Sequence, residues 1–214
     1  MCGRYRLVMA DSEMEEILAA INRQPLADSA PHAVPIWNVS PASTVPVLGP
    51  EGARLMKWGF PPVGEGRRLV INARQETAAA SPYFQGSLAH RRIAVPTSGF
   101  YEWMHDGRNK PTAQYGFLRP NKAALYLAGM YDFFFLPTGE REERFVILTT
   151  AANRAMQAFH HRMPVCLEEE EIFSWLTDDA CVEGILRREQ PRLEAQFVGA
   201  DGREKAEQMN MFFC

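Results

Sequence analysis

Five short, largely apolar segments decide the fold of this chain: RIAV (92–95), FYEWM (100–104), AQYGFL (113–118), LYLAGMY (125–131) and FVILT (145–149). Aromatic and β-branched residues are frequent in them, and turn-forming residues separate each segment from the next. Both features are typical of strands. We therefore expect a sheet-rich core in the middle of the chain.

Further strands are expected on the amino-terminal side of this core. Residues 45–48 and 54–58 are predicted strands joined by the turn Gly49-Pro50-Glu51-Gly52, and residues 69–71 are predicted to form a short buried strand. Residues 24–36 contain three prolines and are expected to be irregular.

Helical patterns flank the strands. The spacing of apolar residues predicts a helix at 12–23, composition predicts one at 153–159, and acidic starts predict helices at 168–176 and 181–188. Because strands dominate the middle and helices gather toward the ends, we predict an α+β fold. Mostly antiparallel sheets should form a curved or barrel-like core with peripheral helices. A length of 214 residues favours one domain, 1–214.

The overall charge and the cysteine pattern argue against several classes of protein. Lys and Arg number 23 and Asp and Glu 26, so the net charge of −3 does not make the chain a general polyanion binder, although a local basic patch stays open. The four cysteines form no CxxC pair and no metal-ligand spacing with the five histidines, so no metal and no other cofactor is expected. Neither a signal peptide nor a membrane span is evident, which predicts a cytoplasmic protein with free thiols and no membrane contact.

Cys2 follows the first methionine directly. Methionine removal generally acts when the next side chain is small, and it would expose an α-amine and a thiol on adjacent carbons. This pair reacts with aldehydes: the amine forms an imine, and the sulfur closes on the imine carbon to give a thiazolidine. Both groups ordinarily titrate near neutrality, at ~8 and ~8.5. Since an early cysteine can also be merely a small residue, other segments must decide its role.

Other polar residues stand in places that favour chemistry. Glu102 lies among aromatic residues in a strand-like run; it is ordinary on a solvent face, whereas burial would raise its pKa and make it a proton donor. The pair His160-His161 lies at a predicted helix end, where a histidine can be a cap or a catalyst. Arginines that would bind phosphates if they converge are Arg4, Arg74 and Arg162.

Taken together, the segments resemble the SOS-response-associated peptidase (SRAP) family. The order and rough spacing match over residues 1 to about 167. The matching motifs are Met1-Cys2-Gly3-Arg4, Trp37-Asn38-Val39-Ser40-Pro41, Trp58-Gly59-Phe60, Ile71-Asn72-Ala73-Arg74 with Glu76-Thr77, Gly99-Phe100-Tyr101-Glu102-Trp103, Phe145 to Ala152, and His160 to Pro164.

The resemblance implies a reaction at Cys2, because the family crosslinks covalently to abasic sites in single-stranded DNA and protects them. Cys2 would be the nucleophile, and Glu102 would protonate the departing ring oxygen or the carbinolamine hydroxyl. Asn72 would position the amine and the sugar. His160 would carry protons; it is preferred to His161 because one residue separates histidine from arginine in the family pattern. The DNA contacts implied in the same way are Arg4, Asn38, Pro41, Arg74, Thr149 and Arg162.

The implied partner is single-stranded DNA that contains abasic sites, bound by a monomer in the cytoplasm, at the nucleoid if the source is a bacterium. Trp37, Phe60 and Trp103 are either platforms on which bases would stack or residues of the core. The chain departs from the family at residues 61–66, where a tryptophan-containing loop is common and no aromatic residue is present. It departs again after residue 167.

Two other functions stay open from the sequence. One is an N-terminal-nucleophile cysteine hydrolase, such as a peptidase or an amidotransferase, in which Cys2 attacks an amide. The other is a non-catalytic module that binds single strands, which would be expected to carry more positive charge. The hydrolase requires an oxyanion hole and an acyl site, for which the sequence offers no motif.

Overall fold

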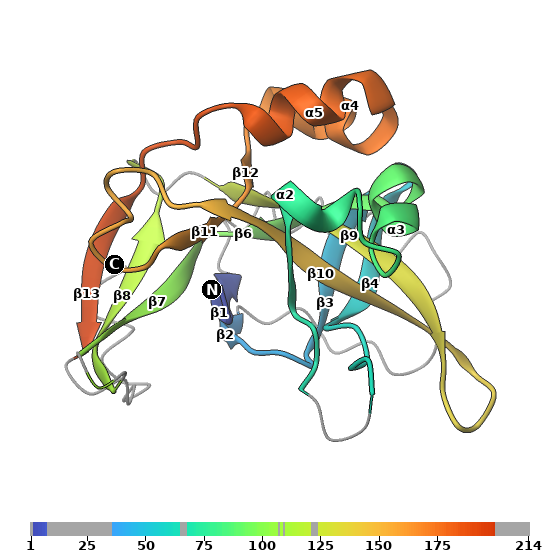
Figure 1. Ribbon diagram of the computed structural model, residues 1–214, viewed down its shortest axis with the longest axis horizontal. Helices are drawn as coiled ribbons and strands as arrows, with labels where there is room; N and C mark the ends of the chain where they lie inside the picture. The colour runs from blue at the N-terminus through green and yellow to red at the C-terminus, as the bar shows by residue number, and fades with distance from the viewer. Residues whose placement is uncertain are drawn as a thin grey trace.

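Two β-sheets form the framework of the protein (Figure 1). The computed structural model describes residues 2–7, 36–64, 68–106, 108, 110–120 and 124–199. The helix predicted at 12–23 and residues 24–35 of the segment expected to be irregular lie outside these described residues.

The first sheet has five strands in the order β13-β8-β7-β1-β2, and each neighbouring pair is antiparallel. The strands are β1 (Arg4–Leu7), β2 (Ile36–Val39), β7 (Gly99–His105), β8 (Pro111–Leu118) and β13 (Glu194–Gly199). Since β1 lies between β7 and β2, hydrogen bonds on both of its edges hold the beginning of the chain inside this sheet.

The second sheet has eight strands, five of which pair in a closed ring. These are β3 (Thr44–Gly49), β4 (Gly52–Trp58), β6 (Arg92–Thr97), β9 (Leu125–Phe135) and β10 (Arg141–Ala151). Four of the five pairings are antiparallel, and the parallel pairing of β10 with β4 closes the ring. The predicted α+β fold with mostly antiparallel sheets is confirmed. The strands predicted at 45–48, 54–58, 92–95, 100–104, 113–118, 125–131 and 145–149 are confirmed as well.

Three short strands attach to this ring. β5 (Asn72–Arg74) runs parallel to β10, β11 (Arg162–Pro164) pairs with the end of β10, and β12 (Cys166–Leu167) pairs with β9. β5 and β11 therefore flank the last residues of β10.

Side chains of the ring alternate between two buried clusters, as the pleat of a strand requires. An inter-sheet cluster joins Tyr5, Phe100 and Phe117 of the five-stranded sheet to Trp58, Phe145 and Ile147 of the ring. An outer cluster joins Ala94, Val146 and Leu148 of the ring to Leu88, Trp175 and Ile185 of the helices. Both faces of β6 and of residues 145–150 of β10 are buried, which explains why these stretches contain nearly continuous apolar runs.

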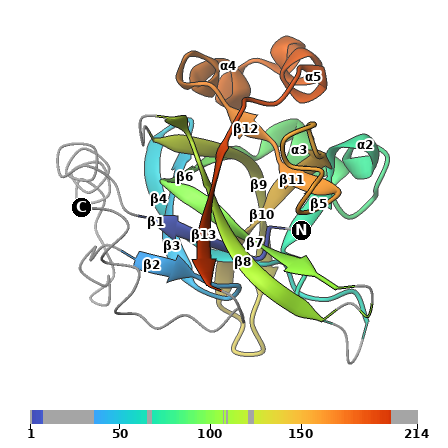
Figure 2. The same cartoon turned by 90° about the vertical axis from the view of Figure 1, so that its left-hand side faces the viewer.

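The helices cover the outer side of the ring (Figures 1 and 2). They are α2 (Gln75–Ala78), α3 (Gln85–His90), the 3-10 turn η2 (Glu169–Glu171), α4 (Ile172–Thr177) and α5 (Asp179–Arg187). The helices predicted at 168–176 and 181–188 correspond to η2 with α4, and to α5. Among the described residues, no helix combines the length and the apolarity needed to cross a membrane.

Two predicted elements were wrong. The strand expected at 69–71 begins instead at Asn72, because the parallel pairing with β10 starts there, and Val70 makes only an isolated bridge to Phe60. Residues 153–159 form hydrogen-bonded turns in place of a helix. The Asn153 side chain accepts a hydrogen bond from the Met156 N–H, as an N-cap residue does, but the backbone hydrogen bonds of the segment end at His160, before a helix is established.

Candidate functional site

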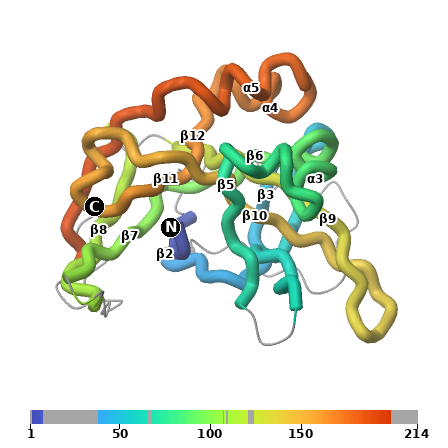
Figure 3. Tube along the Cα trace, in the orientation of Figure 1, coloured from blue at the N-terminus to red at the C-terminus, as the bar shows by residue number. Residues whose placement is uncertain are grey.

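Cys2 lies directly before β1 and is completely buried. The start of β1 is in the middle of the molecule, between β7 and the strands around β10 (Figures 1 and 3). Asn72, the first residue of β5, donates a hydrogen bond of 2.9 Å from Nδ2 to the Cys2 carbonyl. The Cys2 thiol donates to the carbonyl of Arg4 at 3.8 Å. Asn72 and Cys2, which are 70 residues apart in the chain, are thus brought together.

The other amide atom of Asn72 is an unused acceptor. Its Oδ1 is buried and has no hydrogen-bond partner among the described residues. A buried acceptor without a donor is costly and uncommon in a folded protein. This one lies on the side chain that already holds the backbone of Cys2, so it is available to a donor that arrives there.

Glu102 lies on β7 beside the start of β1. The register pairs Arg4 with Tyr101 and Tyr5 with Phe100, and Glu102 follows directly. Glu102 shares a strand face with Phe100, which belongs to the inter-sheet cluster, and it is only 3% exposed. Burial raises the pKa of its carboxyl, while the positive charge at the amino terminus of the chain offsets part of that rise. Of the two readings left open by the sequence, the buried one is confirmed.

His160 is half-buried in the segment that leads into β11. Its Nδ1 accepts a hydrogen bond of 2.9 Å from the Arg162 N–H and lies 3.1 Å from the Arg162 carbonyl. Since a backbone N–H can only donate, we assign the proton of the neutral ring to Nε2. Burial, followed by the amino-terminal charge, lowers the pKa of His160 to about 4. The ring is therefore neutral at pH 7, and it stacks on the exposed ring of His161 with centroids 4.3 Å apart.

One electrostatic neighbourhood contains Cys2, Glu102 and His160, because the amino-terminal charge influences the pKa of all three. The expectation that the thiol titrates near neutrality was wrong: burial and then the negative charge of Glu102 raise the pKa of Cys2 well above its usual range. The thiol at this site is consequently protonated at pH 7.

The predicted DNA contacts near the surface are Arg4, Asn38, Pro41 and Arg74. Arg4 Nη1 donates to Asn38 Oδ1 at 3.0 Å, which links β1 to β2. Arg74 ends β5 and is exposed. Pro41 is half-buried in the tight turn between β2 and β3, where Ser43 N–H donates to the Ser40 carbonyl at 3.1 Å.

Thr149 and Arg162, predicted as further DNA contacts, are buried and bonded to each other. Thr149 is fully buried, and its hydroxyl donates to the Ala73 carbonyl at 3.4 Å. Arg162 donates from Nη2 to the Thr149 carbonyl at 2.6 Å and forms an ion pair with Glu76. Neither side chain is presented to solvent, so their place in the site is internal.

The candidate stacking platforms differ in exposure. Phe60 is fully buried, where it packs on Tyr83 and Phe134. It is therefore a core residue. Trp103 is half-buried, and the side chain of Trp37 lies outside the described residues.

Two residues near the site received no role from the sequence. Glu76 forms an ion pair with Arg162. In the sequence it stood out only as a member of a motif that resembles the family pattern. Tyr5 is fully buried, and its hydroxyl has no hydrogen-bond partner among the described residues. Burial raises the pKa of the Tyr5 hydroxyl, and a negative charge on Cys2 would raise it further. No local pattern in the sequence distinguishes Tyr5 from an ordinary core aromatic.

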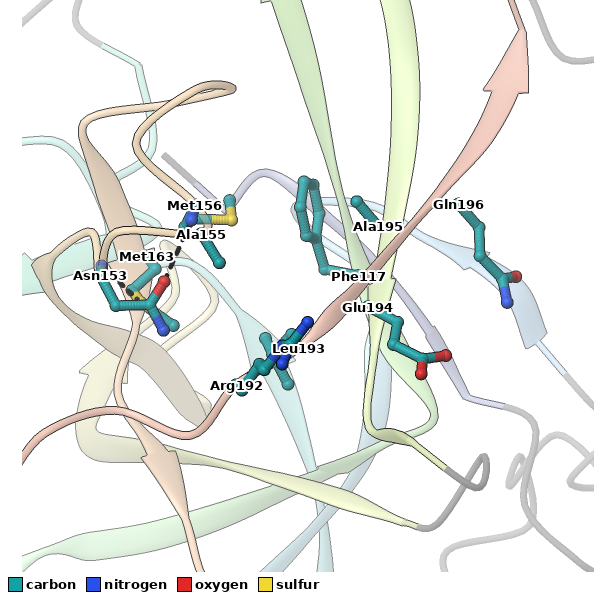
Figure 4. Close-up of a pocket in the computed structure, with 10 residues that line it drawn as sticks. All are labelled: Phe117, Asn153, Ala155, Met156, Met163, Arg192, Leu193, Glu194, Ala195 and Gln196. Atoms are coloured by element: carbon teal, nitrogen blue, oxygen red, sulfur yellow. Dashed lines mark hydrogen bonds between the residues drawn. The ribbon is translucent and has the colours of Figure 1, made fainter.

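A cavity of about 360 Å³ is lined by the turn at residues 153–156 and by the approach to β13 (Figure 4). Phe117, Met156 and Arg192 are among the residues that line it, and the Met156 carbonyl accepts a hydrogen bond from the His160 N–H at 3.1 Å. None of Cys2, Asn72, Glu102 and His160 lines this cavity. It is therefore a neighbour of the site and distinct from it.

The described part of the chain contains no group of three His, Cys, Asp or Glu side chains placed to hold a metal ion. Cys2, Cys166 and Cys181 are free thiols, as predicted for them.

Known proteins resemble this chain in both sequence and fold. The family model described as SOS response associated peptidase (SRAP) matches residues 1–200. The abasic site processing protein YoqW of Bacillus subtilis is 32% identical over 201 residues, which are 87% of each chain. The abasic site processing protein YedK of Escherichia coli is 28% identical over 98% of this chain and 90% of its own. A crystal structure of a Bordetella bronchiseptica protein, 23% identical, superposes with a TM-score of 0.74 over 92% of this chain and all of its own.

Proposed function

Because this chain belongs to the SOS response associated peptidase family, we propose that it is an abasic site processing protein that captures the lesion through Cys2. After removal of Met1, the α-amine and thiol of Cys2 would form a thiazolidine with the aldehyde of a ring-opened abasic sugar in single-stranded DNA. The crosslink would protect the lesion. The reaction belongs in the cytoplasm, and we expect the protein to act as a monomer. The names of its relatives support abasic-site DNA as the partner.

The observation that carries the proposal is the contact between Asn72 and Cys2. The Asn72 Nδ2 group holds the Cys2 carbonyl at 2.9 Å, and its Oδ1 is a buried acceptor without a donor among the described residues. The α-amine of a mature Cys2 is separated from that carbonyl group only by the Cα atom. An amine donating to Oδ1 would satisfy this acceptor and direct its lone pair toward the aldehyde.

Glu102 supplies the protons of the first step. The amine adds to the C1′ aldehyde and gives a carbinolamine. Because its pKa is raised by burial, Glu102 retains a proton at higher pH than an exposed carboxyl and donates it to the carbinolamine hydroxyl, which leaves as water. An iminium and a Glu102 carboxylate remain.

The carboxylate then serves the second step. The buried Cys2 thiol is protonated at neutral pH, so its sulfur must lose a proton as it attacks. Glu102 accepts that proton, and the sulfur bonds to the iminium carbon and closes the neutral thiazolidine. The net change is the loss of one water, with Glu102 returned to its acid form.

His160 is suited to opening the sugar ring before capture. It is neutral at pH 7, with one ring nitrogen held by the Arg162 backbone and the other carrying a proton. We propose that it moves protons between the hydroxyl and the ring oxygen of the closed abasic sugar. Arg4, Asn38, Pro41 and Arg74 would contact the DNA strand, whereas Thr149 and Arg162 support the site from inside.

The test uses a single-stranded oligonucleotide with one abasic site and protein whose loss of Met1 is verified by mass spectrometry. We expect a band of reduced mobility that survives denaturation, no such band with an intact oligonucleotide, and none with Cys2→Ala. Cys2→Ser should form only a reversible imine, which borohydride traps. An adduct that persists in Cys2→Ala would refute the proposal.

The same samples separate the alternatives. An amidotransferase would release ammonia from glutamine without DNA and would leave no adduct. A non-catalytic module would retard the oligonucleotide on a native gel, and the complex would disappear on denaturation.

A further inference from the structure

Glu76 holds the guanidinium of Arg162 at two points. The hydrogen bonds are Nη1 to Oε1 at 2.6 Å and Nη2 to Oε2 at 2.9 Å. A bidentate pair of this kind fixes both the position and the plane of the guanidinium. The Arg162 side chain is 11% exposed and that of Glu76 is 44% exposed. Glu76 is therefore the solvent-facing partner of the pair, and Arg162 is the internal one.

Arg162 connects three strands around the site. Its Nη2 also donates to the Thr149 carbonyl at 2.6 Å and to Thr149 Oγ1 at 3.3 Å. Thr149 Oγ1 in turn donates to the carbonyl of Ala73, next to Asn72 on β5. The clamp on Arg162 therefore reaches from β11 through β10 to the strand that holds the backbone of Cys2.

The backbone of Arg162 can form a hydrogen bond with the His160 ring in both protonation states of the ring. In the neutral ring, Nδ1 accepts from the Arg162 N–H at 2.9 Å. In the protonated ring, Nδ1–H can donate to the Arg162 carbonyl, which is 3.1 Å away. Movement of Arg162 would disturb both hydrogen bonds together.

We propose that Glu76 is a positioning residue of the active site: by clamping Arg162 it fixes the ring of His160 and, through Thr149 and Ala73, the start of β5. This inference rests on the proposed function, because His160 and Asn72 take their roles from that reaction. Glu76 acts through Arg162, without touching the reacting atoms.

The first test needs no DNA. In ¹⁵N-histidine-labelled protein, the ring nitrogens of His160, assigned with His160→Gln, should report the Nε2–H tautomer alone. We expect Glu76→Ala to give a mixture of tautomers at unchanged pH. Glu76→Gln should lie between the two, because its amide oxygen can still accept one hydrogen bond from Arg162. Glu170→Ala, which removes an exposed carboxylate on η2, is the matched control and should match the wild type.

The second test separates positioning from DNA attraction. Single-turnover crosslinking is measured over a range of DNA concentrations. Glu76→Ala should lower the maximal rate about 10- to 100-fold, as expected when a reacting group is misplaced by a fraction of an ångström to one ångström. The DNA concentration at half-maximal rate should change by less than about 3-fold, and Glu76→Gln should restore part of the rate.

The outcomes are distinct. If Glu76→Ala keeps the wild-type tautomer and the wild-type maximal rate, the inference is overturned. It is also overturned if the only effect of Glu76→Ala is tighter DNA binding, because Glu76 would then only compete with a DNA phosphate for Arg162. If the wild type forms no crosslink, the proposed function fails, and the tautomer measurement alone still decides whether Glu76 positions His160. A Glu76→Ala variant that does not fold leaves the decision to Glu76→Gln.

Discussion

The chemical role proposed for Glu102 and the destabilising effect of its ionisation share one cause. Its side chain is buried at 3% exposure on a strand face that otherwise packs the inter-sheet cluster. Burial disfavours the charged form and raises its pKa. The group that keeps its proton to higher pH than an exposed carboxyl is therefore also one whose ionisation opposes folding.

Replacement of Glu102 by Gln should stabilise the protein at neutral pH. Below the unfolded-state pKa, near ~4.3, the carboxyl is protonated in both states and contributes no pH dependence. As pH rises through the raised folded-state pKa, stability is lost, by about 1.4 kcal/mol for each unit between the two pKa values. Glu102→Gln lacks this loss, so its advantage in denaturant unfolding should be larger at pH 8 than at pH 4. Its crosslinking rate should fall about 10²- to 10⁴-fold.

An exposed glutamate provides the control for this comparison. Glu170→Gln should shift the unfolding free energy equally at both pH values, since its side chain is solvated. A pH-independent difference between Glu102→Gln and the wild type would mean that the pKa of Glu102 is not raised in the folded protein.

The identities of these residues could be predicted from the sequence, but their environments could not. The run FYEWM predicts a strand, yet alternation alone does not say which face meets the core. That depends on β1 pairing with β7 in the register Tyr5 to Phe100, a contact between segments 95 residues apart. The raised pKa of the Cys2 thiol follows from the same burial, and a local pattern contains no information on it.

At the scale of elements, the start of β7 depends on a glycine. Gly99 has φ of +151°, and a Cβ there would lie 2.6 Å from the Phe117 carbonyl oxygen of β8. Its backbone N–H donates a hydrogen bond of 3.0 Å to the Thr97 hydroxyl, which fixes the backbone at this position. The strand that carries Glu102 thus begins at a position where no side chain fits.

Gly99→Ala should destabilise the fold by about 2 kcal/mol or more, since it combines a clash with backbone atoms and an unfavourable φ. The matched substitution Gly184→Ala lies in α5, where no atom is within 4 Å of an added Cβ. It should stabilise the protein by about 1 kcal/mol through helix propensity. Urea unfolding measures both, and equal effects of the two substitutions would contradict the assigned close approach.

The elements that the sequence placed wrongly are those whose form is set by distant contacts. β5 begins at Asn72 because β10 pairs with it there. The segment 153–159 has helical composition, but the Asn153 Nδ2 group donates to the Pro191 carbonyl at 3.1 Å, which ties the turn to the approach to β13. The strands of the ring were predictable because their buried parts are rich in apolar residues: the buried parts of β6 and β10 are nearly continuous apolar runs, and β4 alternates buried with half-buried positions.

At the scale of the whole molecule, one side chain joins the two sheets. Trp58 is fully buried, with its ring 5.2 Å from that of Tyr5 and 6.3 Å from that of Phe145. Its Nε1 donates to the Ile71 carbonyl at 3.0 Å, next to Asn72. The shared inter-sheet cluster is the physical reason to expect that residues 1–214 fold as one domain.

Trp58→Phe should therefore weaken both sheets together. The loss of ring volume and of the hydrogen bond to the Ile71 carbonyl should cost about 2–4 kcal/mol. Hydrogen exchange measured by mass spectrometry across a urea series should show peptides of β7–β8 and of β9–β10 losing protection at one lowered midpoint. Phe173→Ala, which truncates a side chain that is 76% exposed, should leave that midpoint nearly unchanged. If Trp58→Phe shifted the ring strands alone, the two sheets would be independent folding units and the single-domain prediction would fail.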